Sequence, residues 1–238
     1  MIAFNKINKT LPAMISGGLF ALTAGTTAAS GHYVVDDAEL IDARSCEAEI
    51  WYTDVDGGGH GSFLSPTCRL DGNWQVTATA GFLREGGENA EVYGLEAKIL
   101  FLDRDTHGYG LGLVAGTEYL SETSRWEVAF AYVPVSVELI PDRALAHVNL
   151  GVERDRGEAD KTAFTWGLGT EARFTDRLGL VVEVFGDDRS GSRPVAQLGP
   201  RIGLLDEHLF LDLTWTRELG GDKQEAWTVG VNFVALNF

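Results

Sequence analysis

Large apolar side chains alternate with small or polar ones along most of the chain, and this alternation constrains the fold more than any other feature. It is clear near the carboxyl terminus, in Trp227-Thr228-Val229-Gly230-Val231-Asn232-Phe233. A period of two residues is the geometry of a β-strand, whose successive side chains point to opposite faces. The alternating blocks are roughly ten residues long, as expected of a tilted strand that crosses a membrane. The pattern therefore predicts an all-β protein that spans a membrane.

Twelve such blocks are separated by turn-forming residues. They cover residues 45–54, 62–70, 73–84, 91–102, 109–119, 125–139, 143–153, 163–174, 178–186, 194–204, 208–217 and 226–238. We predict a single transmembrane antiparallel β-barrel of 12 strands over residues 45–238, because only a closed barrel satisfies its backbone in lipid without helices. Pro66 weakens the second block as a wall strand, since proline cannot donate a ladder hydrogen bond. A ten-strand barrel with an accessory amino-terminal hairpin is the alternative.

Residues 1–29 have the pattern of a secretory signal peptide. Lys6 and Lys9 precede an apolar stretch at 11–24, and small residues follow at 27–30. Residues 30–44 are then expected to form a short periplasmic segment. A leader followed by a barrel indicates the outer membrane of a Gram-negative bacterium, with outer-membrane lipid as its surroundings.

The connections between blocks agree with an amino terminus in the periplasm. Connections after odd-numbered blocks are mostly long, as at 54–61, 154–162, 187–193 and 218–225, and those after even-numbered blocks are short and rich in turn formers. Long external loops and short periplasmic turns are typical of outer-membrane barrels.

The phase of the alternation predicts which face meets lipid. In the block at 109–119 one face carries Tyr109, Leu111 and Leu113, and the other carries glycines and Glu118. We expect the apolar face to point outward, with aromatic side chains near the strand ends forming a girdle at each membrane interface. The expected girdle residues are Trp74, Tyr93, Phe101, Tyr109, Tyr119, Trp126, Phe164, Phe174, Trp215 and Trp227.

The inward phase is acidic, with nine carboxylates against Lys98, Arg173 and Arg201. We expect the lumen to be lined by Glu96, Lys98, Glu118, Glu127, His147, Glu171, Arg173, Glu183, Arg201 and Asp212. If residues 206–207 form a two-residue turn, Arg201 and Asp212 face each other on neighbouring strands as an ion pair. These charges either line a pathway for cations and polar solutes or form a satisfied network that fills a narrow lumen.

The two cysteines are symmetric about residue 57, in the middle of a glycine-rich connection. Folding the first two blocks into a hairpin places Cys46 opposite Cys68, so a disulfide is expected in this exported compartment. Its predicted role is to staple the first hairpin.

Two blocks contain a slip of phase. The outward phase in 125–139 moves from Trp126, Val128, Phe130 and Tyr132 to Val135 and Val137, and a β-bulge at Pro134 is expected to explain this. The last block shows a similar slip between Phe233 and Leu236.

No catalytic, metal or cofactor site is predicted. The histidines have no metal-ligand spacing with cysteine or with one another, and no serine and histidine are brought together by their spacing. His147 is expected to be a lone lumen residue that makes hydrogen bonds. The net charge of −16 argues against nucleic-acid partners. We therefore expect a protein that is not an enzyme.

The carboxyl-terminal third resembles a known family. The segments 175–186, 197–204, 209–215 and 227–233 are similar to the terminal hairpins of the transporter-like MetA-pathway of phenol degradation family. The likeness covers mainly residues 163–238, and Glu183 and Asp212 are its most specific points. It implies a twelve-strand outer-membrane barrel that passes small organic compounds. The terminal Phe238 resembles the signal that barrel assembly machinery recognises, which implies that machinery as a partner.

The function expected from the sequence is an outer-membrane channel or uptake protein for small solutes. The alternative is a structural or surface-interaction barrel whose lumen is closed by its own charges.

Overall fold

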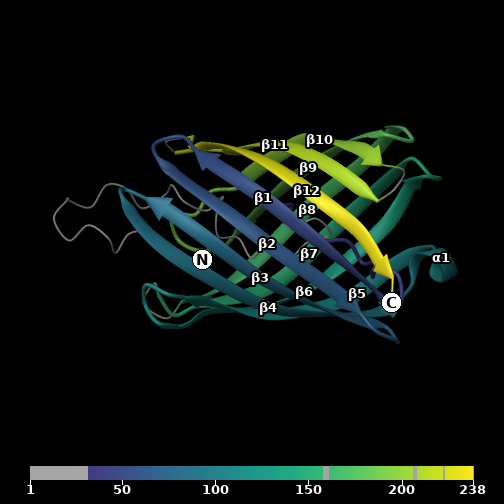
Figure 1. Ribbon diagram of the computed structural model, residues 1–238, viewed down its shortest axis with the longest axis horizontal. Helices are drawn as coiled ribbons and strands as arrows, with labels where there is room; N and C mark the ends of the chain where they lie inside the picture. The colour runs from purple at the N-terminus through teal and green to yellow at the C-terminus, as the bar shows by residue number, and fades with distance from the viewer. Residues whose placement is uncertain (1–31, 158–160, 206–207, 222, 238) are drawn as a thin grey trace.

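A computed structural model gives the structure of residues 32–157, 161–205, 208–221 and 223–237. Within these residues, twelve antiparallel strands each pair with their neighbours in sequence, and β1 pairs with β12 to close the barrel (Figure 1). The strands are β1 (Ser45–Val55), β2 (Gly59–Arg69), β3 (Trp74–Glu85), β4 (Glu88–Leu102), β5 (Tyr109–Leu120), β6 (Arg125–Ile140), β7 (Ala144–Asp155), β8 (Lys161–Thr175), β9 (Leu178–Asp187), β10 (Val195–Leu205), β11 (Leu209–Glu218) and β12 (Glu225–Asn237). The predicted 12-strand barrel is confirmed. The predicted signal peptide, residues 1–29, and Phe238 lie outside the described residues.

The ten-strand alternative is wrong, because β2 is a full wall strand that pairs with both β1 and β3. Pro66 is tolerated because its side chain faces outward, opposite Ala48 of β1. The ladder between β2 and β3 is interrupted beside it, and there the hydroxyl groups of Ser65 and Thr79 lie 2.8 Å apart and form a side-chain hydrogen bond.

The polarity of the wall is apolar outside and polar inside. On β4, Leu95 is 54% exposed, whereas the adjacent Glu96 and the following Lys98 are 8% and 3% exposed. The predicted girdle aromatics lie on the outer face, where Tyr119 and Trp215 are half-buried and the others are exposed. A soluble barrel has the opposite arrangement, so this polarity is that of a barrel surrounded by lipid.

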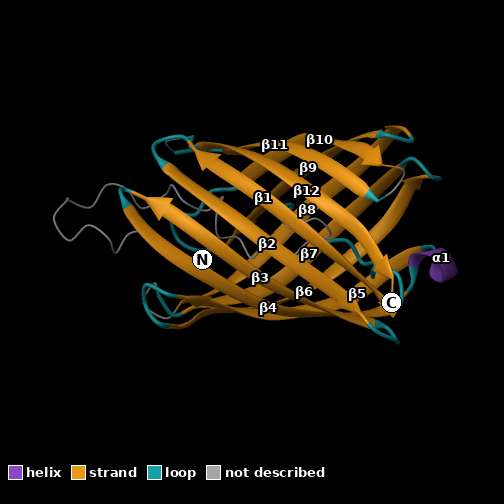
Figure 2. Cartoon of the chain, in the orientation of Figure 1, coloured by secondary structure: helices purple, strands orange, loops and turns teal. Residues whose placement is uncertain are grey.

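Helix α1 (Arg104–His107) is a single turn between β4 and β5, capped at its start by Asp103. Figure 2 shows it at one end of a wall made of strands. Among the described residues, no helix has the length and apolar character needed to cross a membrane.

The end of the barrel where β1 begins and β12 ends is called the periplasmic end below, following the sequence argument; α1 lies at this end (Figure 1). At the opposite end, two connections are tighter than predicted. The predicted loop 54–61 was too long, because β1 continues to Val55 and β2 begins at Gly59. The turn between β3 and β4 contains only Gly86 and Gly87, and their positive φ angles of 58° and 91° suit a tight hairpin.

The prediction of a bulge at Pro134 was wrong. Pro134 pairs with Asn149 in an unbroken stretch of the β6–β7 register. The irregularity lies earlier, where Glu118 pairs with Val128 but Tyr119 pairs with Trp126, so that Glu127 is the extra residue. Beyond this point Val128, Phe130 and Tyr132 share the inward phase of Ser136, and not the outward phase predicted for them. The slip predicted in the last block coincides with a register shift between Cys46 and Ala48 where β1 meets β12.

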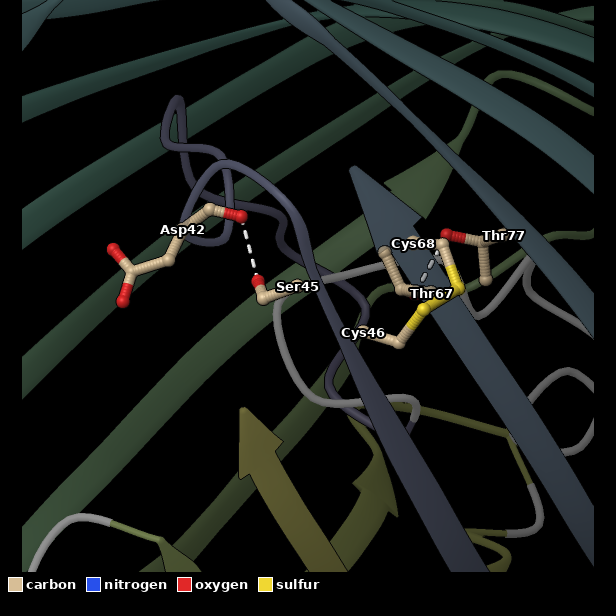
Figure 3. The surroundings of a disulfide bond; sticks show 6 residues. All are labelled: Asp42, Ser45, Cys46, Thr67, Cys68 and Thr77. Atoms are coloured by element: carbon tan, nitrogen blue, oxygen red, sulfur yellow. Dashed lines mark hydrogen bonds between the residues drawn. A yellow bond between two sulfur atoms is a disulfide. The ribbon is translucent and has the colours of Figure 1, made fainter. Parts of the chain in front are cut away.

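The predicted disulfide is confirmed. Cys46 and Cys68 are directly opposite in the β1–β2 register, with their Cα atoms 4.1 Å apart (Figure 3). Inside the adjacent wall, the hydroxyl groups of Thr67 and Thr77 lie 2.8 Å apart and join β2 to β3. The disulfide therefore ties together the periplasmic ends of the first two strands.

Candidate functional site

Residues 32–42, here called the lumenal segment, contact inward-facing side chains from β2 to β11. The expectation that residues 30–44 form a periplasmic segment was therefore wrong for these residues. No strand of the wall hydrogen-bonds to the segment as a neighbour, since the barrel closes through β1 and β12 without it. The segment is held instead by side chains of the wall. These contacts make the lumen the candidate functional site.

Lys98 of β4 is the main ionic anchor of the lumenal segment. Its Nζ atom lies 2.8 Å from a carboxylate oxygen of Asp36 and 3.1 Å from one of Asp37. The same ammonium group donates to the carbonyl oxygen of Glu39 at 3.1 Å. On the other side, the Tyr132 hydroxyl donates to Asp36 at 3.1 Å. The buried cation, the buried carboxylate of Asp36 and the half-buried carboxylate of Asp37 thus satisfy one another, which a charge removed from water requires.

Other wall side chains accept hydrogen bonds from the backbone of the segment. Glu183 of β9 accepts the N–H groups of Val34 and Val35 at 3.0 and 3.2 Å. Ser136 of β6 accepts the N–H of Ala38 at 2.7 Å. Nearer the periplasmic end, Gln75 of β3 accepts the N–H of Ile41 at 3.0 Å. Because the segment has no strand partner, these bonds replace a ladder in satisfying its backbone.

The predicted pairing of Arg201 with Asp212 is confirmed. The two residues face each other across β10 and β11, and Nε of Arg201 lies 3.0 Å from Oδ1 of Asp212. Tyr33 completes this group, because its hydroxyl donates to Asp212 at 3.4 Å and its ring centroid lies 5.2 Å from the Arg201 guanidinium. The amino-terminal part of the segment is thereby held against β10 and β11.

Inward glycines make room for the lumenal segment. A Cβ atom added to Gly110 of β5 would lie 2.6 Å from the carbonyl oxygen of Ala38. One added to Gly167 of β8 would lie 2.8 Å from Val35, and one added to Gly230 of β12 would lie 2.9 Å from His32. A side chain at these positions would occupy the space of the segment, so the glycines form a cradle that fits it.

A serine and a histidine do meet in the lumen, contrary to the sequence analysis. Ser136 and His147 are opposite each other on β6 and β7, with Oγ and Nδ1 2.8 Å apart. Glu171 is 4.0 Å from Nε2 of the same histidine. Ser136 is fully buried beneath Ala38, whose N–H it accepts, so a substrate has no approach to its hydroxyl. The pair holds the segment and does not form an open nucleophilic site.

The remaining predicted lumen residues are spread along the barrel. Glu96 is buried on β4, and Glu171 lies 3.8 Å from Arg201 as well as near His147. Toward the opposite end, Glu127 is buried and accepts a hydrogen bond from Thr123 at 2.7 Å, and Glu118 is half-buried on β5. Arg173 is exposed at the periplasmic end. Of the predicted set, Lys98, Glu183, Arg201 and Asp212 contact the lumenal segment.

Sequence reasoning missed the partners that the segment itself supplies, above all Asp36 and Asp37. One signal was available. Lys98 is one of three cations on an acidic inward face, and its partners come from the segment before the first strand and not from the wall. The inward glycines were a second signal, because a row of missing side chains leaves space for another part of the chain.

Burial shifts the titration of the segment's own side chains. It lowers the pKa of His32 to about 3, reinforced by the charge of Arg201, so the ring is neutral at physiological pH. Burial raises the pKa of Asp36 to about 7 against the opposing charge of Lys98. It also raises the pKa of Glu39 to about 7, with repulsion from Asp37 adding to the effect and Arg104 opposing it.

A family model described as Uncharacterised conserved protein UCP029691 matches residues 18–235. The chain belongs to this family. This match does not confirm the likeness of the carboxyl-terminal hairpins to the phenol-degradation family, so that resemblance stays a prediction. None of the curated proteins compared with the chain matches it.

Solved porin structures share the fold. The structure titled KdgM porin superposes with a TM-score of 0.65 at 11% identity, covering 79% of this chain and 98% of that one. The NanC porin gives a TM-score of 0.60 at 8% identity, with the same coverage of 79% and 98%. Together with the apolar outer face and the closed 12-strand wall, this likeness identifies a bacterial outer-membrane β-barrel.

Proposed function

We propose that the protein is an outer-membrane channel or uptake protein for small solutes, in which the lumenal segment narrows the pathway. The observation that carries this proposal is that the wall closes without the segment, while the lumen is wide enough to hold it. An extended peptide with side chains has the cross-section of a small solute. A lumen that accommodates such a peptide therefore has room for solutes where the segment moves aside.

The way in which the segment is held supports a role in controlling passage. Its contacts are individual ion pairs and side-chain hydrogen bonds, such as Lys98 with Asp36 and Glu183 with Val34. A strand added to the wall would instead be fixed by a continuous ladder. Separate polar contacts exchange with water one at a time, so the segment can shift without opening the barrel.

The candidate solutes are small and polar, because the inward wall is rich in carboxylates and hydroxyls. Small organic compounds are included because the carboxyl-terminal third resembles the phenol-degradation family. Residue-level roles follow from position. Lys98, Glu183, Arg201 and Asp212 hold the segment directly, and His147 does so through Ser136. The remaining path is lined by Glu96, Glu118, Glu127, Glu171 and Arg173.

The second candidate is a structural barrel with a closed lumen. It is favoured by the apolar cluster of Trp51, Phe63 and Leu83, which packs inward in the half of the barrel away from the periplasm, with the Trp51 and Phe63 rings stacked 4.9 Å apart. In this case the lumenal segment is a permanent filling.

Solute flux separates the two candidates. The full-length mature protein is reconstituted into vesicles, and its folding is checked by the change in gel migration on boiling. The control is the same preparation after boiling. We expect swelling with small sugars and amino acids and discrete conductance steps in planar bilayers. Absence of flux for ions and all small solutes from the folded protein would reject the channel in favour of the structural barrel.

A further inference from the structure

We propose that the periplasmic mouth of the barrel contains a binding site for an oxyanion group, a carboxylate or phosphate, held between Arg143 and Arg173. The site is a cavity of about 370 Å³ that opens between α1 and the periplasmic ends of the later strands. The inference deepens the proposed channel function, on which it rests for its biological meaning, because it names a class of solute.

The first observation is the placement of the two arginines. Arg143 is the last residue of the β6–β7 turn, and Arg173 lies near the end of β8. The N–H of Arg173 donates to the carbonyl oxygen of Arg143 at 2.7 Å. The residues are therefore direct neighbours on adjacent strands, and both line the cavity. Like charges in this arrangement repel each other.

The second observation is that no direct contact in the described part of the chain neutralises this pair. Neither guanidinium has an ion-pair or hydrogen-bond partner there, and both side chains are exposed. Five acids also border the cavity, and three of them have partners of their own. Asp105 lies 3.7 Å from Arg104. Glu138 accepts the N–H of Asp142 at 2.7 Å, and Glu171 lies 3.8 Å from Arg201.

The third observation is the shape of the cavity. Gly179 of β9 lies directly opposite Arg173 in the β8–β9 register and opposite Arg201 in the β9–β10 register, so no side chain fills the space between these arginines. Arg104 of α1 borders the cavity from the other side, bound to Glu39 of the lumenal segment at 2.7 Å. A small solute fits this space next to the segment.

The chemistry of the occupant follows from the donors. Two neighbouring guanidinium groups present planar, forked N–H donors that match the oxygens of a carboxylate or phosphate. An oxyanion bound between them removes their mutual repulsion and forms charge-assisted hydrogen bonds. The rest of the cavity includes both acids and apolar residues such as Leu145 and Phe210, which suits a small organic acid better than a highly charged polyanion.

Binding is tested by calorimetry on the folded, detergent-solubilised protein, with succinate and inorganic phosphate as probes. The variant carries Arg143→Gln and Arg173→Gln. Removing the facing charges relieves repulsion, so the barrel is expected to keep its heat-modifiable gel migration. We expect the double variant to bind succinate or phosphate at least tenfold more weakly. Arg143→Lys with Arg173→Lys, which keeps charge but loses the fork, should bind with intermediate affinity.

Arg84→Gln is the matched control, since it removes an exposed arginine at the opposite end of the barrel and should leave binding unchanged. The titration is repeated with anionic phospholipid in the micelles, to distinguish a lipid headgroup from a free solute. If the phospholipid displaces succinate from the parent protein, the headgroup is the source of the oxyanion. Equal affinity in the parent and the Gln double variant, or no binding by the folded parent, would overturn the site. Because the assay needs no flux, its result is independent of whether the channel conducts.

Discussion

The Nζ atom of Lys98 lies 2.8 Å from a carboxylate oxygen of Asp36, and this contact joins β4 of the barrel wall to a segment 62 residues earlier in the chain. Both side chains are almost completely buried. Breaking such a pair leaves an uncompensated buried charge, which costs roughly 3–5 kcal/mol in other proteins. The pair is therefore the point at which a single substitution affects the lumenal segment most.

We expect Lys98→Gln to release the segment while leaving the wall intact, because Asp36 and Asp37 would then be buried without a cation. The released segment should become accessible to protease, and conductance in planar bilayers should rise severalfold. Arg44→Gln is the control, since it removes a cation from the exposed pair with Asp71 at 3.1 Å. Unchanged protease resistance of the segment in Lys98→Gln would contradict its anchoring by this pair.

The glycine cradle leads to a second prediction. In Gly110→Ala the new methyl group would lie 2.6 Å from the carbonyl oxygen of Ala38, so the segment must move away from β5. We expect greater conductance with unchanged heat-modifiable migration. Gly94→Ala is the matched change, because its added Cβ would meet only Thr79 of the wall at 3.3 Å. If both variants behave alike, the segment does not limit the pathway at Gly110.

Protonation of Asp36 and of Glu39 is expected to hold the segment more tightly. Burial raises the pKa of Asp36 and that of Glu39 to about 7 each, whereas carboxyl groups of a released segment titrate at about 4. A group that binds its proton more strongly in the docked state favours docking as the pH falls. Protonation of these two groups should therefore lower the conductance as the pH is lowered from about 7 toward about 4. His32, whose pKa is about 3 in the docked segment, and Asp37, whose pKa is held low by Lys98, act in the opposite direction.

Glu39→Gln isolates this effect, since carboxylates of the wall titrate in both proteins. The variant should show a smaller decrease of conductance over the same pH range. An identical pH profile in the parent and in Glu39→Gln would exclude Glu39 as a contributor.

The disulfide should stabilise the barrel without affecting its conductance. Cys46 and Cys68 are separated by 22 residues, a loop for which the chain-entropy model gives about 3 kcal/mol. The double variant Cys46→Ser, Cys68→Ser should lose its folded gel migration at a lower temperature or denaturant concentration than the parent. In the unreduced parent neither thiol should react with maleimide; labelling of both before reduction would show that the bond is absent.

The strands of the wall and their order could be predicted from the sequence, because each strand and its pairing depend on residues that are close together in the chain. The period of two residues, the turn formers between blocks and the symmetric cysteines place each strand and its neighbour, since adjacent strands are linked by short connections. The facing of Arg201 and Asp212 follows from that register alone. The prediction of which side chains face outward failed from Val128 to Tyr132. The β-bulge that changes the phase lies at Glu127. The alternation of residues shows that such a bulge exists but does not show at which residue it lies.

The contents of the lumen were decided by the tertiary structure. Residues 32–42 have no alternation, and their partners Lys98, Ser136 and Glu183 lie between 61 and 149 residues away in the chain. Such contacts exist only once the barrel has closed and has brought all inward faces around one space. The sequence by itself determined a 12-strand outer-membrane barrel with an acidic interior, and the closed structure decided that the amino-terminal segment occupies that interior, because burying Asp36 and Asp37 requires the cation that β4 supplies.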